Sequence, residues 1–569
     1  MKMGGKSRMA MPIETEARPI LTLFRRVRKA MCPGGAHISG WFGLRGLITM
    51  ALVLLLARFV AAEELQSTMQ SKSVFQRRGF YLHACWVYNY PFAVRTWHRS
   101  DYLNMFRLLK HIGFNTVMMW PTMEAIPAPL SAQDRQSLAQ YRSLVEDARK
   151  TNLQCWLVQC AALTSRPEIR SCPWKDRSLY AYQETVRLDD PKMLDAYLEH
   201  RAAMLEILNN ADGYVTIDGD PGGYPGAQPA EFLEVLKHDR HTLDRIGTHA
   251  QEQRVIPWIW CGWGTKGVWQ EPISPFVAET LKALKQEMPE PWEMLPGRSH
   301  RDGHANGRIV IDETKRAGLL DRSTLMLYEI VEFEPSPPAG LLQFDLIRRV
   351  LKQELGASPG IRGWFANAQT PILAIPNAYL FARGVSDPNY LDEADEKVLT
   401  DLADLLGGSA ELLVPAWACW DRGLADLPGD LPRKLAAATL DSPVARCIPG
   451  GPKRYLDILA ARADSRIRLL NACARKAESP EDAAQVIASA TAALVDWWKH
   501  NGYVSSAKKG EPFQLGFVHH SQLTLLMQWC VQNVTDYEKT SALAVDEIVR
   551  GQTLDRPLAI ECVRQLLKR

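Results

Sequence analysis

The sequence predicts an α/β fold, a (β/α)8 barrel, followed by an all-α domain at the carboxyl end. Three observations lead to this prediction. Apolar, β-rich runs alternate with amphipathic helical stretches from Gly79 to Arg383, in eight successive units. These units cover roughly 300 residues, which suits a barrel whose usual length is about 250. Past Val385 the β-rich runs stop, and apolar residues recur only at helical spacing.

The eight units follow one another in a regular order. The first helix has Ser100 as its expected N-cap and ends at Gly113, and Pro191 opens the third helix. The expected strands are Phe80–Asn89, 115–120, 153–161, 213–220, 255–263, Trp292–Gly297, Ser323–Val331 and Ile361–Thr370. The expected helices are 100–113, Gln133–Lys150, Pro191–Asn210, Ala230–Gln253, Pro275–Met288, Ile309–Ala317, Leu341–Leu355 and a short one ending at Arg383.

The sixth unit is the least regular, because a polar insertion rich in Gly, His and Arg separates its strand from its helix. A doubly wound open sheet is the structural alternative to the barrel. It lacks here the GxGxxG turn that usually follows its first strand.

The length of 569 residues exceeds what one core supports, since single cores stop growing near about 250 to 300 residues. We expect a signal segment with a basic leader over residues 1–62, a linker over 63–78, the barrel over 79–384 and a helical domain over 385–569. The helical domain shows no repeat of fixed period, which argues against a solenoid.

The N-terminal segment has the pattern of an export signal. An apolar run from Leu47 to Ala57 follows basic residues and precedes the small residues Ala61 and Ala62. We therefore expect a secreted or periplasmic protein. An anchor left uncleaved is the alternative, although Arg58 interrupts the run and a span needs about 20 apolar residues. Membrane contact is expected only through this segment.

Charge and cysteine content exclude some partners. A net charge of +3 is close to neutral for this length, so we expect no nucleic acid partner. No cysteine or histidine cluster has zinc spacing, so we expect no metal. Cys85, Cys155, Cys160 and Cys261 lie in apolar runs, where we expect buried thiols. The oligomeric state is not predicted.

In this barrel class the site lies at the carboxyl ends of the strands. Strand ends that only pack are usually Val, Ile or Leu, whereas these carry aromatic, amide and carboxylate side chains. Aromatic faces stack on sugar rings, and amides and carboxylates hydrogen-bond hydroxyl groups, so we predict a carbohydrate cleft. Its expected substrate-binding residues are His83, Trp86, Asn89, Trp120, Glu124, Trp260, Trp263, Tyr328, Trp364, Asn367 and Gln369.

The stretch TIDGDPGGYPG, residues 216–226, places two aspartates where the fourth strand is expected to end. Asp218 and Asp220 are at i and i+2, so on an extended chain both project from one face. Two close carboxylates repel each other, which raises the pKa of one of them and suits it to act as an acid. We expect Asp220 to be the catalytic acid and Asp218 its partner, with Glu329 on the seventh strand as nucleophile or base.

Other interpretations of this turn stay open. The aspartates can bind substrate without proton transfer, bind a cation such as Ca²⁺, or cap backbone N–H groups. Hydrolysis of a glycosidic bond needs no cofactor, because protonation and attack by water or a carboxylate suffice.

The export signal, the barrel with acidic residues after its fourth strand, and the trailing helical domain resemble secreted TIM-barrel glycoside hydrolases. The resemblance is to the hexosaminidase, O-GlcNAc hydrolase and α-glucuronidase group, and it covers roughly Gly79 to Arg383. It implies a carboxylate pair after strand four; in the hexosaminidases this is Asp-Glu, and in the O-GlcNAc hydrolases two adjacent Asp. This chain departs from both patterns because Gly219 separates Asp218 from Asp220.

We therefore expect a glycosidase that acts on an oligo- or polysaccharide by carboxylate acid/base catalysis, with no cofactor. Two alternatives stay open: a carbohydrate-binding barrel without catalysis, and a metal-assisted barrel hydrolase.

Overall fold

The computed structural model describes residues 75–84, 90–174, 177, 182–218, 228–260, 273–298, 308–328, 330–332, 341–421, 427–499 and 520–567. The expected signal segment lies outside these residues. Among the helices of the described ranges, none is both long enough and apolar enough to span a lipid bilayer.

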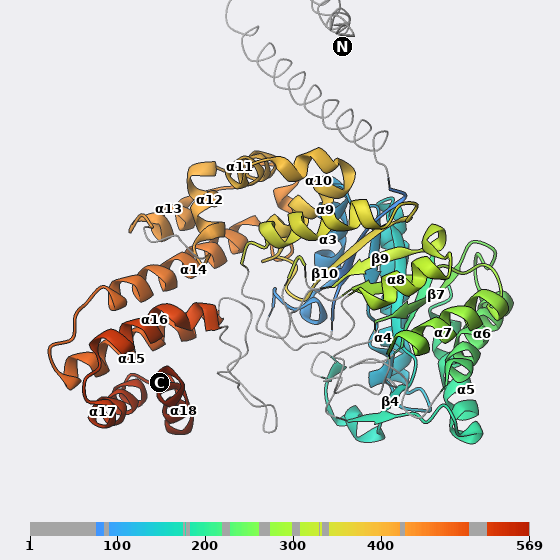
Figure 1. The fold of residues 1–569 in the computed structure, drawn as a ribbon, viewed down its shortest axis with the longest axis horizontal. Coiled ribbons are helices and arrows are strands. Elements are labelled where there is room, and N and C mark those ends of the chain that lie inside the picture. The colour runs from blue at the N-terminus through green and yellow to red at the C-terminus, as the bar shows by residue number, and fades with distance from the viewer. Residues whose placement is uncertain are drawn as a thin grey trace, which may run out of the picture. The chain divides into compact units, whose positions relative to one another are not determined.

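Eight parallel strands close into a barrel in the order β1, β10, β9, β8, β7, β6, β3, β2, as the sequence predicts. In Figure 1 the barrel part of the chain runs from blue to yellow, and the helices toward the carboxyl end are orange and red. Strands β1 and β10 complete the cylinder by pairing the first strand of the barrel with the last. The strands are β1 Arg77–Leu82, β2 Thr116–Met119, β3 Gln154–Cys160, β6 Gly213–Ile217, β7 Arg254–Ile259, β8 Leu295–Arg298, β9 Thr324–Leu327 and β10 Gly363–Ala368.

One helix of the barrel follows each strand. They are α3 Arg99–Ile112, α4 Ala132–Lys150, α5 Pro191–Ile207, α6 Pro229–Ile246, α7 Ile273–Glu287, α8 Ile309–Arg316, α9 Phe344–Ala357 and α10 Ile375–Ser386. Helix α3 begins earlier than Ser100 suggests, because the Asp101 carboxylate accepts the N–H of His98, the true N-cap, at 3.0 Å. Helix α6 ends at Ile246, since Gly247 adopts an extended conformation with ψ of 135°.

The sequence did not predict a small hairpin between β3 and α5. Strands β4 (Leu163–Ser165) and β5 (Gln183–Thr185) pair antiparallel, apart from the barrel sheet. Each has three residues, too few for a two-residue alternation to stand out in the sequence.

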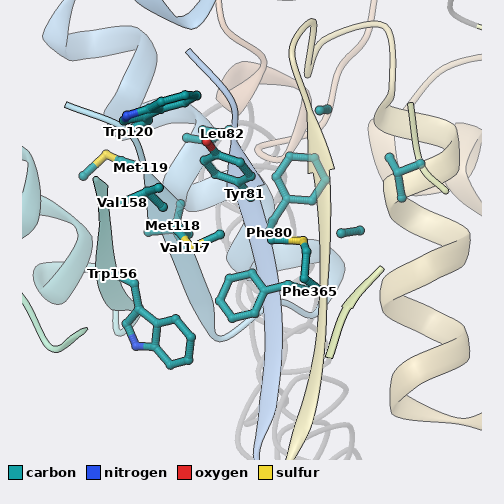
Figure 2. Packing of buried hydrophobic residues seen from close by; sticks show 14 of the residues in the cluster. Phe80, Tyr81, Leu82, Val117, Met118, Met119, Trp120, Trp156, Val158 and Phe365 are labelled. Atoms are coloured by element: carbon teal, nitrogen blue, oxygen red, sulfur yellow. The ribbon is translucent and has the colours of Figure 1, made fainter. Parts of the chain in front are cut away.

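Large aromatic side chains from opposite strands fill the barrel interior in layers. Trp156 of β3 and Phe365 of β10 meet at one level, with ring centroids 4.9 Å apart. Gly79 of β1 makes room there, because a Cβ at this position would lie 2.3 Å from the Phe365 ring. One layer nearer the carboxyl ends, Tyr81 meets Trp258 of β7 edge to face at 5.7 Å. Figure 2 shows the two levels, with Tyr81 on one and Trp156 and Phe365 on the other.

A charge cluster closes the amino end of the barrel. The carboxylate of Glu293, just before β8, accepts hydrogen bonds from Arg77 Nε at 3.0 Å and from Arg362 Nη1 at 2.8 Å. Arg254 Nε lies 3.7 Å from the same carboxylate, and Arg77 Nη1 also donates to Gln154 Oε1 at 2.7 Å. Strands β1, β3, β7 and β10 and the segment before β8 are thereby tied together at their starts.

The chain past the barrel is helical where the structure describes it. The helices are α11 Asp395–Leu406, α12 Ala410–Ala418, α13 Leu431–Ala437, α14 Pro452–Cys473, α15 Pro480–Lys499, α16 His520–Asn533, α17 Tyr537–Arg550 and α18 Arg556–Leu566. The barrel core continues into this part as far as Ala463, and a second core extends from Cys419 to Leu566. The predicted boundary near residue 384 therefore follows the change in secondary structure, and as a domain boundary it stays a prediction.

Cys155 and Cys160 of β3 are buried free thiols, as predicted. Cys85 and Cys261 lie outside the described residues. Within the described ranges, no group of three His, Cys, Asp or Glu side chains is arranged to hold a metal ion.

Candidate active site

Ring side chains from several strands meet at the carboxyl end of the barrel. They enclose a cavity of about 20 Å³, which is room for about one water molecule. His83, Trp120, Trp260 and Tyr328 are predicted to belong to the site, and the structure brings all four together. The full lining is Tyr81, His83, Trp120, Val158, Ile217, Trp258, Trp260 and Tyr328.

The rings hold one another in a fixed arrangement. The His83 imidazole stacks on the Trp120 indole with an interplanar angle of 7° and centroids 5.3 Å apart. Tyr328 meets His83 edge to face at 6.0 Å and lies 5.6 Å from Trp260. Aromatic pairs in these geometries are each worth about 0.5 to 1.5 kcal/mol beyond area burial, so the contacts stabilise this arrangement of the lining.

Sequence reasoning missed Tyr81 and Trp258. Each lies two residues before a predicted site residue, Tyr81 before His83 and Trp258 before Trp260. Side chains at i and i+2 of a strand face the same side, so this spacing was the signal that could have found them.

Burial lowers the pKa of His83 to about 3, so its imidazole is neutral near neutral pH. A neutral imidazole can both donate and accept a hydrogen bond, which suits it to a sugar hydroxyl group.

The unfolded chain binds a proton at His83 below its ordinary pKa of 6.5, whereas the folded protein does not until about pH 3. The neutral His83 therefore contributes fully to the free energy of unfolding well above pH 6.5, and this contribution is lost as the pH falls from 6.5 toward 3. Between pH 6 and pH 5 the free energy of unfolding should fall by about 1 kcal/mol more in the wild type than in His83→Asn. Urea unfolding at both pH values measures the difference. Replacing the exposed His241 of α6 by asparagine should preserve the wild-type pH dependence, and an unchanged slope in His83→Asn would contradict the assignment.

Three buried carboxylates at this end each accept a backbone N–H from the end of the next barrel strand. Glu124 follows β2 and accepts from Cys160 of β3, and Asp218 follows β6 and accepts from Trp260, just after β7, at 3.1 Å. Glu332 follows β9 and accepts from Thr370, just after β10, at 3.0 Å. These strand pairs are neighbours in the barrel, so each carboxylate joins two adjacent loops of the rim.

Asp218 is fully buried, and its described contact is a backbone cap. This geometry fits one of the interpretations that the sequence left open, in which an aspartate of the turn satisfies a backbone N–H group. The contact also holds Trp260 in place, because the bonded N–H belongs to that residue.

Glu124 lies behind the aromatic lining. Its Oε2 accepts the indole N–H of Trp120 at 2.9 Å, and its backbone carbonyl accepts the Ser165 hydroxyl. Burial raises the pKa of this carboxyl, against the effect of its donors. The sequence predicts that Glu124 binds substrate directly. In the structure its two oxygens orient Trp120 and anchor the end of β3, so Glu124 has a positioning role, and its contact with substrate stays a prediction.

The three predicted residues of β10 differ in their placement. Asn367 lies in register with Tyr81 near the carboxyl end, and Gln369 follows the strand directly; both are buried. The prediction for Trp364 is wrong. It is the second residue of β10, pairs with Arg78 at the amino end of β1, and packs edge to face on Phe75. Alternation along the strand turns it away from the barrel interior.

The remaining predicted residues lie outside the described ranges: Trp86, Asn89, Asp220, Trp263 and Glu329.

No protein-family model and no curated protein sequence matches this chain. Among solved structures, an O-GlcNAc hydrolase mutant from Thermobaculum terrenum is similar at 12% identity and TM-score 0.41, covering 87% of this chain and 94% of that one. A broad-specificity endoglucanase from an uncultured bacterium is similar at 9% identity and TM-score 0.37, covering 56% and 96%. An endo-glycoceramidase II from Rhodococcus sp. is similar at 13% identity and TM-score 0.32, covering 52% and 73%. At these identities and scores, none of these likenesses carries an argument about activity.

Proposed function

We propose that this protein is an exported barrel glycosidase that hydrolyses an oligo- or polysaccharide without a cofactor. The observation that carries the proposal is the gathering of His83, Trp120, Trp260 and Tyr328 at the carboxyl end of the barrel, beside Asp218. Indole and phenol rings stack on sugar rings, and a neutral imidazole is a partner for a hydroxyl group. The enclosed cavity holds only about one water molecule, so the proposal places the sugar at the outer edge of this cluster.

The proposed chemistry assigns the proton transfer to Asp220. Asp218, two residues before Asp220 in the chain, accepts the N–H of Trp260. A negative charge on Asp218 would favour the protonated form of Asp220, which is the form that a general acid needs. Glu329, which directly follows Tyr328, is the proposed nucleophile or base.

Replacement of Asp220 by asparagine tests the proposal. Turnover of a panel of 4-nitrophenyl glycosides and soluble polysaccharides should fall at least about a hundredfold, because general acid catalysis contributes that much or more. Binding of the same sugars, measured by calorimetry, should persist. The matched control is Asp404→Asn, an exposed aspartate of α11, which should keep wild-type turnover. Unchanged turnover in Asp220→Asn would contradict the role of Asp220.

A carbohydrate-binding barrel without catalysis is the second candidate. One observation favours it: Glu124, Asp218 and Glu332, three buried carboxylates at the described rim, all bind backbone N–H groups. In that case the wild type binds sugars without turnover, and Asp220→Asn binds them equally well.

A further inference from the structure

The last two helices form a surface that neither the barrel nor the proposed activity explains. Helices α17 and α18 border a groove of about 700 Å³. Ile560 lies in it with 50% of its surface exposed, and it is one of three exposed large hydrophobic side chains in the described part of the chain. The groove is lined by Tyr537, Glu538, Ser541, Ala542, Val545, Asp546, Arg556, Ile560, Arg564 and Leu567.

Helices α17 and α18 pack against each other with only five residues between them, so they run antiparallel, and an exposed ion pair marks their register. Arg556 at the start of α18 donates to Asp546 near the end of α17 at 2.6 Å. Glu538 lies eight residues before Asp546 on α17, and Arg564 lies eight residues after Arg556 on α18. Eight helical residues span about 12 Å at 1.5 Å per residue, so Glu538 and Arg564 lie at one level, about 12 Å from the ion pair. Halfway between these levels, Ala542 comes level with Ile560.

The charges of the groove are divided between its two sides. The α17 side carries the acidic residues Glu538 and Asp546, and the α18 side carries the basic residues Arg556 and Arg564. Asp546 pairs with Arg556 across the groove, and at the other level Glu538 lies on the side opposite Arg564, whose guanidinium also pairs with Glu561 of its own helix at 2.8 Å. Apolar side chains lie between these two levels.

This division makes the groove complementary to itself. A twofold axis parallel to the helices would place α17 of one copy over α18 of another, so that each acid meets an arginine at the same level. A twofold axis across the helices would instead place acid against acid and base against base. Closed dimers use the same patch on both subunits, which is the arrangement that the first axis produces.

We propose that a second copy of this chain docks on the α17–α18 groove about a twofold axis parallel to these helices. Glu538 of each copy then lies opposite Arg564 of the other, and the two Ile560 side chains are covered at the centre. Exposed ion pairs add little affinity, so burial of Ile560 drives association and the charges select the orientation. Two short helices per copy make a small interface, which predicts a weak dimer.

Sedimentation equilibrium of the full chain over a range of concentrations tests the proposal. The wild type should show a monomer–dimer equilibrium, and Ile560→Asp should abolish it. Glu538→Arg and Arg564→Glu should each raise the dissociation constant at least about tenfold, because each places like charges face to face twice in the dimer. All these residues are exposed, so circular dichroism and thermal unfolding should be unchanged.

Mixing the two charge variants separates this interface from any other. In the mixed dimer the two reversed side chains face each other with opposite charges, and the unchanged Glu538 of one copy faces the unchanged Arg564 of the other. An equimolar mixture of Glu538→Arg and Arg564→Glu should therefore dimerise like the wild type. Arg550→Glu, an exposed change on α17 outside the groove, should have no effect. A wild type that stays monomeric, a dimer that tolerates both reversals, or a mixture that fails to associate would each overturn the proposal.

Discussion

Replacing Glu293 by glutamine is expected to lower the free energy of unfolding by about 3 to 5 kcal/mol, the usual effect of removing one partner from a buried ion pair. Glu293 is the acceptor for Arg77 and Arg362 and lies near Arg254. Its carboxylate is 3% exposed, so water cannot replace it. Without its negative charge, three guanidinium groups at the amino end of the barrel would repel one another across a buried amide.

Urea unfolding followed by far-ultraviolet circular dichroism measures this effect. The matched control is Glu287→Gln at the end of α7, whose carboxylate is 56% exposed and pairs with Lys237 at 2.8 Å. An exposed pair of this kind contributes about 0 to 1 kcal/mol, so the control should unfold close to the wild type. Equal stabilities for the two variants would show that the cluster does not hold the strand starts together.

Replacing Asp239 by asparagine is expected to have an effect of similar size, about 3 to 5 kcal/mol. Asp239 of α6 accepts Arg201 Nε and Nη2, each at 2.7 Å, and Thr216 of β6 also donates to it. Although burial lowers the pKa of Arg201, the neighbouring Asp239 raises it above its ordinary value. The variant would leave a cation almost fully buried between the barrel wall and helices α5 and α6.

The same unfolding measurement tests this prediction, with Glu234→Gln as its control on the same helix. Glu234 is 56% exposed and pairs only weakly with Lys237, so its loss should cost less than about 1 kcal/mol. Wild-type stability in Asp239→Asn would mean that Arg201 finds enough acceptors in the carbonyl of Cys160 and the hydroxyls of Tyr197 and Thr216.

The alternation of strands and helices was predictable because each element carries its own local pattern. Runs such as the one that contains β3 are mostly apolar, and the helices show a 3.6-residue period with proline at the start of α5. The irregular sixth unit was also found, although β8 begins at Leu295, three residues after the predicted start. The ends were less predictable, since hydrogen bonds such as that from His98 to Asp101 involve single residues.

The aromatic part of the candidate site was predictable for a similar reason. His83, Trp120, Trp260 and Tyr328 stand at or just after strand ends, and a closed barrel brings such positions together. Trp364 shows the limit of this reasoning. A tryptophan near the middle of an apolar run can face the interior or the helices, and a shift of one residue in the strand exchanges the two faces.

The roles of the carboxylates were the least predictable feature. The sequence positions of the rim carboxylates do not distinguish them from groups that act on a substrate. All of them follow strands at the expected end of the barrel: Glu124, Asp218 and Glu332. Whether such a group faces solvent or a backbone N–H depends on the neighbouring strand, whose bonded residue lies 36 to 42 residues away along the chain. No local pattern encodes that distance.

The amino-acid sequence by itself determined that this chain forms a (β/α)8 barrel with a helical extension and that aromatic residues gather at the carboxyl ends of its strands. Both follow from periodicity and strand order, which are local or topological properties. Only the tertiary structure decided which rings enclose the cavity, that Trp364 packs outside the barrel, and that three rim carboxylates hold loops. Those outcomes depend on strand register and on contacts between neighbouring strands, where a displacement of one residue changes the partner of every side chain.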